Sequence, residues 1–120
     1  MECIEIYTGS DGHSHFRRIE AFEVSPVSFN GVDVSLSSPQ ACESVLLHEF
    51  DSDYFLGWHN PPSRQYVFVL AGELEIAVGN GDAAQRFAAG AVFIAGDSHG
   101  KGHTTRAILA GRALVVNLRG

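Results

Sequence analysis

The stretch that decides the fold runs from residue 57 to residue 72 and reads GWHNPPSRQYVFVLAG. Its second half, residues 65–70, is a short aliphatic and aromatic run that predicts a strand buried on both faces. The Pro-Pro-Ser step before this run and Gly72 after it are turn signals. His59 and Gln65 are six positions apart, and side chains an even number of positions apart share one face of an extended chain.

The rest of the chain repeats this pattern of short β-like runs between turn signals, which is typical of a sandwich or barrel. Asn80-Gly81 is the strongest hairpin signal among them. No helical pattern of ten or more residues is present, and residues 83–89 fit a strand that enters a turn. The sequence therefore predicts an all-β fold, with further strands over residues 32–36, 45–50, 73–78, 91–95, 104–109 and 113–118.

Length and composition narrow the class of protein. The 120 residues fit one domain, and 45% of them are hydrophobic, as in ordinary globular proteins. The formal net charge of -6 argues against nucleic acid and anionic membranes as partners, since both select basic surfaces. We expect a cytoplasmic protein with reduced thiols, because the chain has no long apolar run, no signal-peptide pattern at its start and only two cysteines.

The central stretch resembles the first sequence motif of the cupins, G-x5-H-x-H-x3-4-E-x6-G. His59 falls on the first His position, and Gln65 falls where the motif has Glu. Gly72 follows Gln65 at the required spacing. The second His position holds Pro61, and the leading Gly position holds Asp53. The match is therefore partial, and it lacks one imidazole and the carboxylate.

A second motif follows at residues 90–103, where Gly90 matches the first position of the cupin pattern G-x5-P-x-G-x2-H-x3-N. The His position holds Lys101, and His103 lies two residues further on. The sequence Gly-Lys-Gly-His at residues 100–103 resembles that of a subgroup of short single-domain cupins. The resemblance covers about residues 50–117. It implies one RmlC-like domain over residues 1–120, a double-stranded β-helix or jelly-roll barrel, with residues 1–26 as N-terminal strands or an arm. Residues 1–26 have no clear strand pattern, and such a segment can pair along a sheet edge of a partner subunit. Together with the abundant aromatic residues, this predicts a homodimer.

The resemblance implies a metal site of His59, Gln65 and His103, with His99 as a further ligand. Imidazole nitrogens and amide oxygens suit borderline divalent ions such as Zn²⁺, Ni²⁺ or Fe²⁺. A triad of two histidines and a carboxylate, as in non-haem iron oxygenases, cannot be formed from these positions. A neutral ligand set favours Lewis-acid or proton-transfer chemistry, because the ion keeps its full charge.

Other candidate residues flank these motifs. Arg106 is a candidate for binding a substrate carboxylate, and Trp58 is a second substrate-binding candidate. His48 lies in the preceding predicted strand and is left open between a ligand and a hydrogen-bonded strand residue. His13 and His15 lie in a Gly/Ser/Asp-rich stretch that is typical of a surface turn.

Three functions stay open from the sequence. The first is a metalloenzyme that isomerises, cyclises or eliminates on a small organic molecule, with His59 and His103 as catalytic groups. The second is a module that binds a small ligand without chemistry, its metal site partly lost. The third is metal-free acid–base catalysis by either histidine, since only histidine titrates near neutrality without perturbation.

Overall fold

The computed structural model describes residues 1–118, which form ten β-strands and no helix. Nothing in this part of the chain is a helix long and apolar enough to cross a membrane. The strands are β1 (Glu2–Thr8), β2 (Ser14–Glu20), β3 (Val24–Phe29), β4 (Val32–Ser37), β5 (Ser44–Phe50), β6 (Phe55–His59), β7 (Gln65–Val78), β8 (Ala83–Ala88), β9 (Val92–Ala95) and β10 (His103–Asn117).

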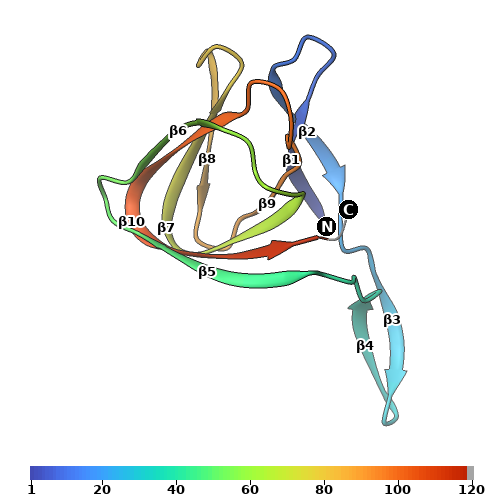
Figure 1. Ribbon diagram of the computed structural model, residues 1–120. Helices are drawn as coiled ribbons and strands as arrows, with labels where there is room; N and C mark the ends of the chain where they lie inside the picture. Colours follow the sequence, from blue (N-terminus) through green and yellow to red (C-terminus); the bar gives the residue numbers. More distant parts are fainter. Residues whose placement is uncertain (119–120) are drawn as a thin grey trace.

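Eight of the strands form one strongly curved sheet (Figure 1). Its order is β2-β1-β9-β7-β10-β5, with β6 beside β10 and β8 beside β7. All pairs are antiparallel except β1 with β9. The predicted all-β jelly-roll fold is confirmed. The edge strands β2 and β5 do not pair with each other within residues 1–118, so the barrel stays open along one side.

The two longest strands differ from the prediction, which divided each of them at a turn. β7 continues through Gly72, and β10 continues through Ala110 and Gly111. Gly72 has φ +80°, and a Cβ there would lie 2.7 Å from the carbonyl oxygen of Leu109. The β7–β10 register also shifts between residues 107 and 113. These glycines therefore bend two paired strands around a corner of the barrel, which requires the same backbone freedom as a turn.

The inside of the curved sheet holds the main hydrophobic core. Alternate residues of β7, β9 and β10 point inward, as period two requires. The buried cluster includes Ile6, Val67, Val69, Leu74, Ile76, Phe87, Phe93 and Ala113.

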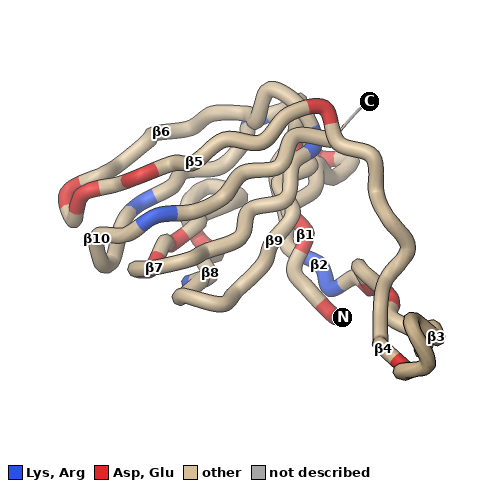
Figure 2. The backbone as a smooth tube through the Cα atoms, turned by 90° about the horizontal axis from the view of Figure 1, so that it is seen from below, with Lys and Arg blue, Asp and Glu red and all other residues tan. Residues whose placement is uncertain are grey.

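The first 26 residues divide between the barrel and a projection from it. β1 and β2 belong to the eight-stranded sheet, where β1 pairs with β9 of the same chain. β3 and β4 pair only with each other, as a second, two-stranded sheet. This hairpin extends away from the barrel near the N-terminus of the chain (Figures 1 and 2).

Candidate functional site

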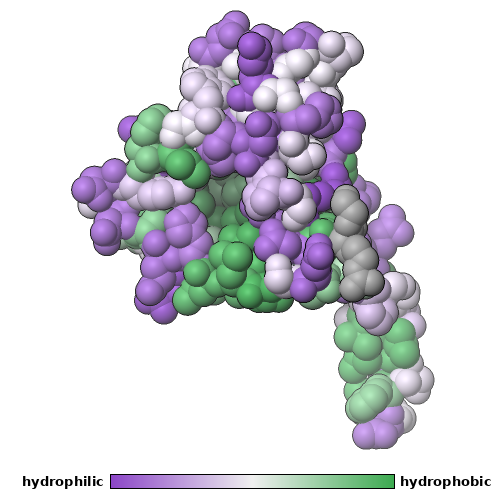
Figure 3. All heavy atoms as spheres, in the orientation of Figure 1, coloured by the Kyte–Doolittle hydropathy of each residue, from purple (hydrophilic) through white to green (hydrophobic). Residues whose placement is uncertain are grey.

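A cavity of about 210 Å³ opens inside the barrel, between the β5–β6 side and the first half of β7. Figure 3 shows it as a hollow with hydrophobic atoms inside and polar residues around its rim. The walls are mainly apolar, and a few polar side chains converge on them, as is usual for small-molecule sites. The polar lining residues are His48, Tyr54, His59, Asn60, Gln65, His103 and Thr105.

His59 and His103 meet because they face each other across two paired strands. His59 is the last residue of β6, His103 is the first of β10, and their Cα atoms are direct partners in the antiparallel register. Opposite residues of such a pair carry their side chains on the same face. The two imidazole rings lie 4.4 Å apart between centroids. Sequence positions 44 residues apart thus form one pair on the cavity wall.

Both imidazoles are fixed through the same nitrogen. His59 Nδ1 lies 2.7 Å from the Gly57 carbonyl oxygen, and His103 Nδ1 lies 2.7 Å from Asp97 Oδ2. A carbonyl oxygen only accepts, so His59 must carry its proton on Nδ1, and the carboxylate selects the same tautomer for His103. Nε2 of each ring makes no hydrogen bond within residues 1–118, so its lone pair remains available to a ligand.

The surroundings of His59 favour its neutral form. Burial lowers the pKa of His59, and the nearby His103 lowers it further, while the hydrogen bond to Gly57 and the charge of Asp97 act in the opposite direction. A neutral imidazole with a free Nε2 lone pair can accept a proton or coordinate an ion.

Asp97 holds His103 in place and was missed by the sequence analysis. Its side chain is fully buried, and its Oδ2 also accepts a 2.6 Å hydrogen bond from Ser14 Oγ. The second oxygen, Oδ1, has no partner among the described residues. Ser14 lies 83 residues away on β2, so no local pattern joins it to this network. The result is a buried Ser14–Asp97–His103 chain that ends at the cavity.

Gln65 begins β7 and lines the same cavity, beside β9 and the last residue of β10. Its Nε2 donates a 2.8 Å hydrogen bond to Oδ1 of Asn117, its cross-strand partner on β10. Asn117 in turn donates to Ser44 on β5. Because the amide nitrogen is engaged, the carbonyl oxygen of Gln65 is the atom left for a ligand.

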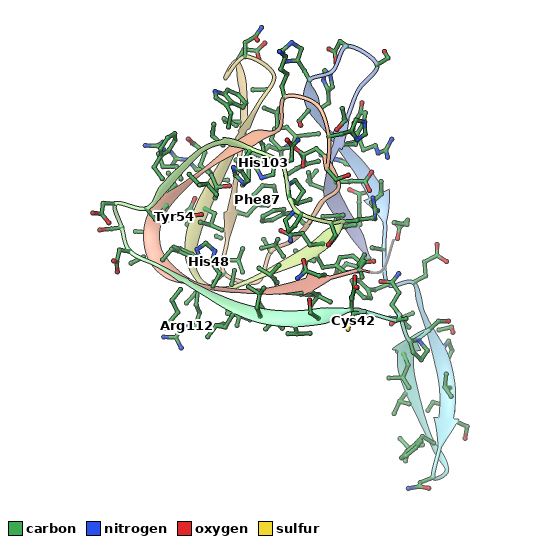
Figure 4. All side chains as sticks on the ribbon, viewed as in Figure 1. Cys42, His48, Tyr54, Phe87, His103 and Arg112 are labelled. Atoms are coloured by element: carbon green, nitrogen blue, oxygen red, sulfur yellow. The ribbon has the colours of Figure 1, made fainter. Side chains whose placement is uncertain are left out.

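His48 and Tyr54 also line the cavity and point into the barrel (Figure 4). Their rings are 5.0 Å apart in an edge-to-face arrangement, and Phe50 packs against both. Burial lowers the pKa of His48 and raises the pKa of the Tyr54 hydroxyl, which favours the uncharged form of each. Even parity along β5 places His48 and Phe50 inside. Tyr54 lies just before β6, where no periodic pattern marked it.

Three predicted site residues lie away from this cavity. His99 is exposed in the loop before β10, where its carbonyl oxygen accepts a hydrogen bond from Thr8. Arg106 points outward, one residue out of phase with Thr105, and its guanidinium lies 2.8 Å from Glu75. Trp58 is half exposed and lines a separate surface hollow with Lys101. Their roles as metal ligand and substrate-binding residues stay predictions.

The residues present fit a divalent ion only if Gln65 takes part. Within residues 1–118, no three His, Cys, Asp or Glu side chains are arranged to hold a metal. Two imidazole Nε2 atoms and one amide oxygen form the available set. Imidazoles that ligate metals generally donate their other N–H to a carboxylate or backbone carbonyl, and both histidines do so here.

Comparisons with known proteins bear on the fold. No protein-family model and no curated protein matches the chain. A conserved Streptococcus pyogenes protein of unknown function, SPY1581, matches in crystal structure with a TM-score of 0.52 and 23% identity, over 71% of each chain. An RmlC-like cupin protein from Desulfovibrio desulfuricans matches with a TM-score of 0.48 and 20% identity, over 96% of this chain and 79% of that one. The likeness to the Streptococcus pyogenes protein shows a shared fold.

Proposed function

We propose that this cupin-type barrel is a small-molecule metalloenzyme in which His59, Gln65 and His103 hold a divalent ion. One observation carries the proposal: both cavity imidazoles are tethered through Nδ1, so two Nε2 lone pairs are free in the cavity that Gln65 also lines. Fixed tautomers and orientations are what a metal site needs from its surroundings.

The type of chemistry follows from the charges of the ligand set. A divalent ion such as Zn²⁺, Ni²⁺ or Fe²⁺ would act as a Lewis acid on a bound carbonyl or water, because three neutral ligands leave its charge undiminished. His48 also lines the cavity. Burial lowers its pKa and so favours the neutral imidazole, which can accept a proton from a bound molecule. The small, mainly apolar cavity favours a compact organic substrate. Isomerisation, cyclisation or elimination fits these parts, with His59 and His103 placed at the reacting atoms.

A second candidate function is supported by the Asp97–His103 pair. A buried carboxylate that accepts a hydrogen bond from the Nδ1–H of an imidazole orients that ring and stabilises the imidazolium that forms during catalysis. His103 would then act as a general base through Nε2 without any metal. Binding of a small ligand without chemistry remains the third alternative. The proposal also includes a cytoplasmic location, in which the thiols of Cys3 and Cys42 would stay reduced.

Metal content separates these functions. We expect the purified, untagged protein to contain close to one divalent ion per chain, and the His59→Ala/His103→Ala variant to contain little. Elemental analysis measures both, with His15→Ala as a matched control because His15 lies on β2 and does not line the cavity. Saturating ion should also raise the melting temperature of the parent, since a ligand at about 100 times its Kd adds about 2.7 kcal/mol. If Zn²⁺, Ni²⁺ and Fe²⁺ all fail to bind, the metalloenzyme proposal is wrong.

Asp97 should act as a positioning residue for this ion. In Asp97→Asn the charge that orients His103 is lost while the side-chain volume stays nearly the same. We expect Zn²⁺ affinity to fall by about 10- to 100-fold, the range typical of such supporting groups. Calorimetric titration measures the affinity, and the thermal transition shows that the variant is folded. Asp11→Asn, an exposed carboxylate beside His15, should leave the affinity unchanged. Equal affinity in both variants would remove Asp97 from the site.

A further inference from the structure

A second hollow, of about 410 Å³, lies at the end of the barrel where the β1–β2 and β7–β8 turns project beside each other (Figure 1). The loop that leads into β10 passes between these turns. The hollow shares no lining residue with the cavity of His59 and His103, so the two are separate. We call it the lysine hollow; its lining residues are His13, Trp58, Gly79, Asn80 and Lys101.

Lys101 lies beside His13 because the loop before β10 packs on the β1–β2 turn. A Cβ on Gly100 would lie 2.6 Å from the carbonyl oxygen of Gly12, so only glycine allows this approach. The Lys101 N–H donates a 2.9 Å hydrogen bond to the same oxygen. Since His13 follows Gly12 directly, this contact brings His13 and Lys101 to one hollow.

Lys101 lies beside Trp58 through a second glycine contact. A Cβ on Gly102 would lie 2.6 Å from the carbonyl carbon of His59, which places the loop against the end of β6. Trp58 is the residue before His59. Asn60, the residue after it, donates a 2.9 Å hydrogen bond to the same loop. The backbone of Lys101 is thus held from both sides, so less ordering is needed when a ligand binds.

The charge of Lys101 is not balanced by a carboxylate. Lys101 is the only lysine of the chain, its side chain is exposed, and it takes part in none of the ion pairs within residues 1–118. Asp11 and Asp82 line an adjoining hollow, but both are engaged there. Asp11 is bonded to His15, and Asp82 accepts a hydrogen bond from the Asn80 N–H. The lysine hollow therefore favours a ligand with a negative charge.

Two neutral side chains add hydrogen-bond donors beside the lysine. Nδ1 of His13 is buried and has no hydrogen-bond partner within residues 1–118. A buried N–H without an acceptor is costly, so the neutral ring carries its hydrogen on Nε2, the nitrogen left for a ligand. Asn80, on the exposed β7–β8 turn, has a side-chain amide with two further N–H donors. Donors from three separate loops thus surround one hollow.

Trp58 supplies an apolar surface next to these donors. Its side chain is 50% exposed, although this end of the barrel is mainly hydrophilic (Figure 3). Neighbouring residues of a strand point to opposite faces, so Trp58 points away from the cavity that His59 lines. An indole ring packs favourably against another flat ring. The hollow therefore combines a stacking surface with donors for an anionic group.

We propose that the lysine hollow binds a small molecule in which an aromatic ring carries one carboxylate or phosphate group. The ring stacks on Trp58, and the anionic oxygens accept hydrogen bonds from the three donors. A charge-assisted hydrogen bond is stronger than a neutral one, so Lys101 contributes more to the affinity than either neutral donor. Binding here needs no ion in the cavity, so the inference does not rest on the proposed metal site.

Tryptophan fluorescence tests the proposal, because Trp58 is the only tryptophan in the chain. Phenyl phosphate and benzoate are the probes, since they carry the two kinds of anionic group on the same ring. We expect at least one of them to change the Trp58 emission along a saturable curve, and the tighter probe identifies the group. Benzyl alcohol lacks the charge and inorganic phosphate lacks the ring, so each should bind at least about 10-fold more weakly in competition. If neither aromatic anion changes the emission, the proposal is wrong.

Lys101→Gln removes the charge and keeps most of the side-chain length. We expect the affinity for the tighter probe to fall by about 10-fold or more, since hydrogen bonds to charged groups are the stronger ones. Arg112→Gln is the matched control, because it removes an exposed cation that does not line the hollow and should leave the affinity unchanged. Circular dichroism and the thermal transition show that both variants are folded. Equal affinity in Lys101→Gln and the parent overturns the proposal.

Two further variants locate the bound probe. Trp58→Ala has no tryptophan signal, so saturation-transfer NMR on the ring protons of the probe replaces fluorescence, and the transfer seen with the parent should be lost. The His59→Ala/His103→Ala variant should bind the probe as the parent does. Loss of binding in that variant would place the probe in the cavity and overturn the separate site. A chain that binds the probe but no metal leaves this inference standing, so its failure and that of the proposed function are distinguishable.

Discussion

The Gly102→Ala variant is expected to lose both stability and zinc binding. Gly102 has φ +78°, a conformation that costs residues with a Cβ about 1–2 kcal/mol. A Cβ there would also lie 2.6 Å from the carbonyl carbon of His59 and closer still to its oxygen. The backbone cannot yield without moving β6 away from β10. We expect the free energy of unfolding to fall by about 2–4 kcal/mol, and the His59–His103 pair to separate.

Gly81→Ala is the matched control, because it carries the cost of the backbone conformation without the steric contact. Gly81 has a similar φ of +88°, but a Cβ there would meet nothing within 4 Å. We expect it to cost only about 1–2 kcal/mol and to leave the cavity unchanged. Urea denaturation measures both stabilities, and calorimetric titration with Zn²⁺ measures the site. If the two variants are equally stable and bind zinc equally well, the contact at Gly102 does not position the histidines.

The same contact explains how far the sequence could predict the site. The motif positions indicated His59, Gln65 and His103, and all three line the same cavity. The Gly-Lys-Gly-His sequence is informative because Gly102 lies against the backbone of His59, where β6 meets the start of β10. Asp97 and Ser14 could not be predicted as partners, because their hydrogen bond joins β2 to the loop after β9, and these segments are distant in the sequence. Such non-local pairs leave no periodic signal.

The fold shows the same division between local and non-local information. Hydrophobic alternation predicted most strands, and Asn80-Gly81 correctly marked the β7–β8 hairpin. Gly72 and Gly111 were wrongly taken as ends of strands. A glycine serves a tight turn or a bend between two paired strands equally well, and only the partner strand decides which one forms. β4 was predicted over residues 32–36, but β3 was not, and no local pattern shows that their hairpin pairs with no other strand within residues 1–118.

Glu5 is the clearest case of a residue whose role depends on partners that the sequence could not assign. Its side chain, on β1, is only 2% exposed. Arg17, its cross-strand neighbour on β2, donates from Nε at 2.6 Å, and Arg64 pairs with the other carboxylate oxygen. Alternation along the chain alone would point the side chain of Arg64, next to Gln65, away from the cavity and into solvent. Instead, both arginines cover a buried carboxylate with their stems while their charged ends remain about half exposed.

Removing both arginines should therefore lower the free energy of unfolding far more than their half-exposed positions would indicate. In Arg17→Met/Arg64→Met the apolar stems remain, but the Glu5 carboxylate is buried without a counter-charge. Such a loss typically costs about 3–5 kcal/mol. Arg18→Met/Arg112→Met is the matched control. It removes two arginines that face exposed carboxylates at 3.6 and 3.8 Å, and it should cost about 0–1 kcal/mol. Denaturant unfolding compares the two pairs.

A third substitution decides whether the cost arises from the unpaired charge or from lost packing. Adding Glu5→Met to the Arg17→Met/Arg64→Met background removes the buried charge while keeping a side chain of similar length. Buried ion pairs replaced as a whole by apolar residues are often no less stable than the original. The triple variant should therefore recover most of the stability that the double variant loses. If it recovers none, the arginines stabilise β1 through their packing on the sheet, and the carboxylate of Glu5 contributes little.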